Sequence, residues 1–149
     1  MEAHRLGSCK RIKILVDTNF LILLATGIIA PSLIDEAVDY SYELLVPESV
    51  VEELVKLTRE APSDKTRKSA SRTLGFLEAG EISYKRIPSE ASNPDDDLIL
   101  LARNIRASGC RVLIASNDRE LRRRARQAGI ATLYYRESKG LLETDWILL

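Results

Sequence analysis

Short apolar runs alternate with longer helical stretches along this chain of 149 residues. Runs rich in aliphatic and β-branched residues predict strands, and apolar residues at helical spacing predict helices between them. The alternation is typical of an α/β fold around a mostly parallel sheet. The predicted strands are residues 11–16, 42–46, 81–87, 111–115 and 131–135, and the predicted helices are residues 19–25, 32–40, 48–58, 65–79, 95–108 and 118–127.

The length and an ordinary hydrophobic share of 45% indicate a single domain over residues 1–149. The apolar run over residues 14–30 contains Asp17, and a central aspartate costs roughly 2.5–3.5 kcal/mol on membrane-insertion scales. We therefore interpret this run as a buried strand leading into a helix, and expect no association with a membrane. The first residues also lack the apolar core of a secretory signal.

Two cysteines, Cys9 and Cys110, lie far apart in the chain and form no CxxC pair. This spacing is not that of a disulfide framework. We therefore expect no disulfide, and a reducing cytoplasmic location.

Acidic residues follow two of the predicted strands, one directly and one after two small polar residues. Asp17 comes after the first strand and Asp118 after the fourth, so both should reach the edge of a parallel sheet where binding sites form. A run of three aspartates, residues 95–97, opens the helix that precedes the fourth strand. Helix capping is the alternative interpretation at each position, but capping explains only one or two acids of the triplet.

The residue inventory narrows the chemistry to carboxylates. His4 is the only histidine, so a Ser-His-Asp or Cys-His nucleophile is not expected. The chain has no glycine-rich phosphate loop, and its cysteines and histidine are too few for a structural zinc site. Carboxylates gathered at one edge repel one another unless some bind protons or a cation, and oxygen ligands suit Mg²⁺ or Mn²⁺.

The net charge is zero, but basic residues are unevenly distributed. The segment from Arg103 to Arg126 contains eight arginines and only two acidic residues, and a second basic cluster covers residues 65–72. Solvated helix faces explain either cluster alone. Together, beside an acidic site, they suggest a nucleic acid as partner.

Four segments together resemble the PIN domain family, in particular the archaeal and eukaryotic PIN nucleases of small-subunit ribosomal RNA processing. They are ILVDTNFL (residues 14–21), VPESVVEELVKL (46–57), DDLILLA (96–102) and IASNDRELRRRA (114–125). The resemblance spans residues 10–141 and implies a three-layer α/β/α sandwich. Residues 142–149 match no known motif, and form either a docking tail or an element packed on the core.

The resemblance also implies site residues. Asp17, Glu53, Asp97 and Asp118 match the family's metal-binding and catalytic acids. Two alternatives stay open: Glu52 in place of Glu53, and Asp96 as a fifth acid, while Asp95 is expected to remain in solvent. Polar residues that orient ligands or water fall at Thr18, Asn19, Ser116 and Asn117.

The function implied is a Mg²⁺- or Mn²⁺-dependent endoribonuclease acting in ribosomal RNA processing. A toxin ribonuclease of a toxin–antitoxin pair and a non-catalytic RNA-binding module of ribosome assembly are the alternatives. Possible partners besides RNA are a second copy of the chain and a ribosome-assembly protein. The residues expected to contact the RNA backbone, which would make binding salt-dependent, are Arg119, Arg122, Arg123, Arg124, Arg126, Lys65, Arg67, Lys68 and Arg72.

Overall fold

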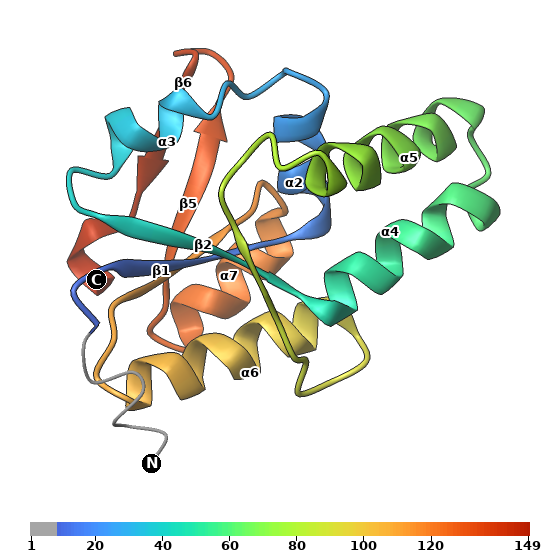
Figure 1. The fold of residues 1–149 in the computed structure, drawn as a ribbon. Helices are drawn as coiled ribbons and strands as arrows, with labels where there is room; N and C mark the ends of the chain where they lie inside the picture. Colours follow the sequence, from blue (N-terminus) through green and yellow to red (C-terminus); the bar gives the residue numbers. More distant parts are fainter. Residues whose placement is uncertain (1–8) are drawn as a thin grey trace.

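A computed structural model describes residues 9–149, so His4 lies outside the described residues. Six strands form one sheet in the order β3-β2-β1-β4-β5-β6, in which β6 alone is antiparallel to its neighbour (Figure 1). The strands are β1 (Ile12–Val16), β2 (Tyr42–Pro47), β3 (Lys85–Ile87), β4 (Val112–Ala115), β5 (Ala131–Arg136) and β6 (Leu141–Thr144). The helices are α2 (Thr18–Ala25), α3 (Ser32–Ala37), α4 (Glu48–Glu60), α5 (Asp64–Glu78), α6 (Pro94–Ala107), α7 (Arg119–Gln127) and the 3-10 turn η1 (Trp146–Leu148).

Both faces of the sheet are covered, which confirms the predicted α/β/α sandwich. Along β1, Ile14 and Val16 pack in one core with residues of α2, α3, α4 and α5, whereas Leu15 packs in the other with residues of α6 and α7. Successive side chains of a strand point to opposite faces, so a strand covered on both sides is mostly apolar. This is why the central strands appear in the sequence as largely apolar runs, interrupted only near the starts of β1 and β2 by Lys13 and Glu43.

The predicted elements differ from the structure mainly at the periphery. The helix predicted over residues 32–40 ends at Ala37, and the strand predicted over residues 81–87 is only Lys85–Ile87, at the sheet edge. The C-terminal residues form β6 and η1, with Leu142 buried in the core. No helix among the described residues is long and apolar enough to cross a membrane.

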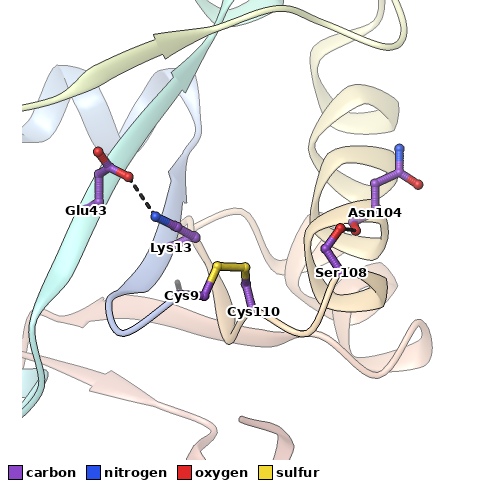
Figure 2. Close-up of a disulfide and its surroundings, with 6 residues drawn as sticks. All are labelled: Cys9, Lys13, Glu43, Asn104, Ser108 and Cys110. Atoms are coloured by element: carbon purple, nitrogen blue, oxygen red, sulfur yellow. Dashed lines mark hydrogen bonds and ion pairs between the residues drawn. A yellow bond between two sulfur atoms is a disulfide. The ribbon is translucent and has the colours of Figure 1, made fainter. Parts of the chain in front are cut away.

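A disulfide joins Cys9 to Cys110, which corrects the expectation of no disulfide (Figure 2). Cys9 lies shortly before β1 and Cys110 shortly before β4, and these strands are parallel neighbours. Their starting points therefore meet, with the two Cα atoms 5.3 Å apart. Spacing along the chain did not show this because the pairing depends on the strand order.

Candidate active site

Asp17 and Asp118 lie together at the carboxyl edge of the sheet. They follow β1 and β4, which are paired in register up to Val16 and Ala115. Each also caps a helix: an Asp17 oxygen accepts a hydrogen bond from the Phe20 amide (2.7 Å), and an Asp118 oxygen accepts one from the Leu121 amide (3.0 Å). Capping and site formation are therefore not exclusive, because capping engages one carboxylate oxygen and leaves the other.

Ser116 connects these two acids from a fully buried position. Its hydroxyl donates to the second oxygen of Asp17 and accepts from the Asp118 amide at 3.0 Å. The predicted polar helper Ser116 thus contacts the Asp17 side chain and the Asp118 backbone.

The pKa of Asp17 is raised to about 6, mainly by burial and to a smaller extent by the charges of Asp95 and Asp118. Hydrogen bonds from Ser116 and Phe20 offset part of this rise. The pKa of half-buried Asp95 is also raised, first by burial and then by the charges of Asp118 and Glu53. The four carboxylates of Asp17, Glu53, Asp95 and Asp118 therefore share one electrostatic environment, and we call them the acidic cluster.

Glu53 is tied to this cluster through α2. The Thr18 hydroxyl donates a hydrogen bond to a Glu53 oxygen, and Thr18 itself is buried beside Asp17. Glu52, the alternative, is exposed on α4. The contact favours Glu53 as the member of the pair that serves the site.

Asp97 lies in a different environment from the acidic cluster. It is fully buried; one oxygen accepts from the Ser49 hydroxyl (2.6 Å) and the other from the amides of Glu90 (2.6 Å) and Ala91 (3.0 Å). These bonds join α6 to the start of α4 and to the loop before α6. The role of Asp97 as a metal ligand stays a prediction, whereas its observed contacts are structural.

Asp95 is the acid that the sequence interpretation passed over. It was expected in solvent, but the structure places it half-buried within the field of the cluster. Helical spacing held the signal: Asp97 shares the buried stripe of α6 with Leu98, Leu101 and Ile105. Asp95 lies one turn before Leu98, at the border of that stripe, so helical spacing alone indicated a partly buried position for it.

Replacing Asp97 with alanine should lower the free energy of unfolding by about 3 kcal/mol. The change leaves the buried Ser49 hydroxyl and the amides of Glu90 and Ala91 without their hydrogen-bond acceptor. Asp96→Ala is the matched control. Asp96 is exposed and its carboxylate pairs only with Arg124 at 2.8 Å, so about 1 kcal/mol or less should be lost. Urea unfolding of the two variants measures both, and equal losses would contradict the structural role of Asp97.

The remaining predicted helpers do not touch the acidic cluster. The Asn117 amide group donates to the Tyr135 carbonyl (3.0 Å) and accepts from the Tyr135 amide (2.8 Å), which extends the pairing of β4 with β5. Asn19 is exposed, and its side chain makes no hydrogen bond among residues 9–149. Asp96, the suggested fifth acid, points to Arg124.

The predicted RNA-binding residues of α7 divide by their contacts. Arg119 and Arg126 are exposed and have no ion-pair partner in the described part of the chain. Arg123 pairs with Glu120, and Arg124 with Asp96. Arg122 instead lies over the Tyr134 ring at 3.6 Å, half-buried, so it contributes to the packing of α7.

The basic residues of α5 flank a surface hollow of about 580 Å³. Lys65, Lys68 and Arg72 line it, together with Thr26 at the far end of α2 from Asp17. Arg67 turns away and donates to the carbonyls of residues 61 and 62. Three of the four predicted RNA-binding residues of α5 thus lie together on one basic surface.

The acidic cluster suits a water-rich site for a hard cation. Within residues 9–149, no three His, Cys, Asp or Glu side chains are arranged to hold a metal ion by themselves. Mg²⁺ commonly keeps several waters and binds through one or two carboxylates, so a complete protein cage is not required. The oxygen-only donors and their mutual repulsion both fit such an ion.

The fold and the acidic cluster define a class of α/β proteins, in which helices cover both faces of a mostly parallel sheet and carboxylates gather at its carboxyl edge. A family model described as PIN like domain matches residues 14–138, and the chain belongs to this family. Among 25 matching chains of solved structures is the "Structure of the PIN domain endonuclease Utp24", with a TM-score of 0.64 and 20% identity. That match covers 89% of this chain and 90% of the other. A search of curated proteins finds no match.

Proposed function

We propose that this protein is a divalent-metal-dependent endoribonuclease. The observation that carries the proposal is the acidic cluster of Asp17, Glu53, Asp95 and Asp118 at the carboxyl edge of a PIN-like fold. Membership of the family and the similarity to a PIN domain endonuclease support it.

The chain's own residues would prepare the site in three ways. Asp17, Asp95 and Asp118 would hold Mg²⁺ or Mn²⁺ directly or through water, and the Thr18 contact would orient Glu53 toward the same ion. Ser116 fixes the Asp17 carboxylate relative to the start of α7. When bound, the divalent ion supplies Lewis-acid chemistry to the scissile phosphate and to the attacking water.

RNA would approach along the basic surfaces on either side of the cluster. Arg119 and Arg126 on α7 and Lys65 and Arg72 on α5 are exposed cations suited to phosphate contacts. Lys68 faces the same hollow while pairing with Asp64 at 3.1 Å. This arrangement supports RNA as the substrate.

Ribosomal RNA processing in the cytoplasm is the setting we propose, because the doubled aspartate (Asp96 and Asp97) and the NDRELRRR segment resemble the processing branch of the family. A second copy of the chain or a ribosome-assembly protein would be the partner there. The toxin alternative shares the chemistry and differs in its RNA target. A non-catalytic RNA-binding module is the other alternative. The observation that favours it is that, within the described residues, no three acidic, histidine or cysteine side chains are arranged to hold a metal ion.

Cleavage of structured RNA with Mn²⁺, Mg²⁺ or EDTA tests the proposal. Asp95→Asn and Asp118→Asn should each lower the rate at least about 100-fold, because each removes an anionic ligand of the ion. Asp96→Asn, with its side chain toward Arg124, is the control and should keep most activity. RNA binding that persists in EDTA without any cleavage in Mn²⁺ would favour the non-catalytic module instead.

A further inference from the structure

Aromatic and basic side chains gather at the amino edge of the sheet, opposite the acidic cluster. Tyr40 precedes β2, Arg111 precedes β4, and Trp146 begins η1 after antiparallel β6. In Figure 1 the C-terminus lies beside the starts of β1 and β2, away from α4. The five residues of β1 span roughly 17 Å, so this edge is well separated from Asp17.

These side chains form a preassembled hollow of about 390 Å³, lined by Asp39, Tyr40, Arg111, Trp146 and Leu149. The Arg111 guanidinium lies over the Tyr40 ring at 4.6 Å, and the Tyr40 and Trp146 rings meet edge-on at 6.3 Å. Tyr40 is 53% exposed and Trp146 41% exposed. Large aromatic side chains this exposed leave ring surface available to a ligand.

The side-chain donors of the hollow make no hydrogen bond or ion pair within residues 9–149. No carboxylate or carbonyl accepts from the Arg111 guanidinium, and neither the Tyr40 hydroxyl nor the Trp146 indole N–H makes a hydrogen bond there. The lining thus offers several hydrogen-bond donors beside flat aromatic surface. The Asp39 carboxylate, which only accepts hydrogen bonds, lies among them.

The backbone beneath this hollow is firmly held. The Arg111 carbonyl accepts from the Lys13 amide (2.9 Å), and the Ser41 carbonyl accepts from the Ile12 amide (2.8 Å). Cys110, next to Arg111, is cross-linked to Cys9, and the Thr132 hydroxyl donates to Asp145 (2.9 Å) just before Trp146. A ligand would therefore meet a rigid platform, which limits the entropy lost on binding.

We propose that this hollow binds one unpaired nucleotide of an RNA strand, outside the cleavage site. The base would stack on the Trp146 ring with Tyr40 at its side, and Arg111, which lies over the Tyr40 ring, would donate to the phosphate. Asp39 would accept from the exocyclic amine of cytosine, adenine or guanine, a group that uracil lacks. The inference rests on the proposed RNA substrate, and gives the enzyme a second contact point for its RNA.

The single tryptophan of the chain makes the proposal directly measurable. Single-stranded oligo(C) added to the Asp118→Asn protein, which should not cleave it, is expected to quench Trp146 fluorescence to saturation. Oligo(U) should bind more weakly. Arg111→Gln removes the phosphate contact and Tyr40→Ala removes the ring beside the stacked base, so each should weaken binding by roughly 5-fold or more. Arg136→Gln, whose side chain pairs with Glu143 near the opposite end of β5, is the matched control.

This readout does not depend on cleavage, so the two proposals can fail separately. Quenching by oligo(C) in a protein that never cleaves RNA would support the nucleotide site and reject the nuclease. Oligonucleotide binding detected by anisotropy, with unchanged Trp146 fluorescence and no loss in Arg111→Gln, would overturn the nucleotide site alone. Quenching by an acidic peptide but not by RNA would overturn it in favour of a protein partner.

Discussion

Asp17→Asn should abolish metal-dependent RNA cleavage and, in EDTA at pH 7, raise the free energy of unfolding by up to about 3 kcal/mol. The gain follows from burial, which raises the pKa of Asp17 from 3.8 to about 6, and each pKa unit corresponds to about 1.4 kcal/mol. Asparagine keeps an oxygen for the Phe20 amide and carries no charge to bury. A site that must hold charge for function is thus expected to be unfavourable for folding.

The sign of the pH dependence separates this explanation from a packing effect. A carboxyl whose pKa is raised in the folded state stabilises the fold fully below pH 3.8, and this contribution is lost as the pH rises through about 6. Urea unfolding in EDTA should therefore show that the stability advantage of Asp17→Asn over the wild type grows between about pH 4 and pH 6. A variant less stable than the wild type at pH 7 would contradict the argument.

Removing the Cys9–Cys110 disulfide should lower the free energy of unfolding by about 2–5 kcal/mol. The bond closes a loop with a sequence separation of 101, and its loss frees that loop in the unfolded chain. Denaturation with and without a reductant, together with Cys9→Ser, measures the effect. Cys9→Ser is the milder variant, because Cys110 is buried and Cys9 is not.

Cleavage activity is the control for the disulfide. The bond lies at the amino edge of the sheet and the acidic cluster at the carboxyl edge, so the reduced protein should keep its cleavage rate while it remains folded. A reductant that changes neither the unfolding midpoint nor its slope would show that the bond does not hold the fold.

The order of elements was predictable because it depends on local patterns. Mostly apolar runs indicated β1, β2, β4 and β5, and the first three of these have residues in both cores. Gly109 and Gly129 marked the ends of α6 and α7, where both adopt positive φ. The short edge strand β3 and the antiparallel β6 were harder to place, because an edge strand has fewer neighbours to shape its composition.

The site was only partly predictable for the same reason. Asp17 and Asp118 follow directly from strand ends, and the structure brings both to one edge. The choice among the three aspartates of α6 required tertiary contacts. Asp97 is hydrogen-bonded to Ser49 and to the loop before α6, whereas the charges of Asp118 and Glu53 act on Asp95. Residues adjacent along a helix point about 100° apart, so neighbours with the same chemistry can have unrelated surroundings.

The sequence by itself determined the α/β class, the acids at the strand ends and the family to which this chain belongs. These features were predictable because strand patterns, helix patterns and short motifs each depend on residues that are close together in the sequence. The tertiary structure alone decided the pairing of Cys9 with Cys110, the different surroundings of Asp95 and Asp97, and the aromatic hollow around Trp146. Each depends on segments far apart in the chain that meet only through the order of the strands.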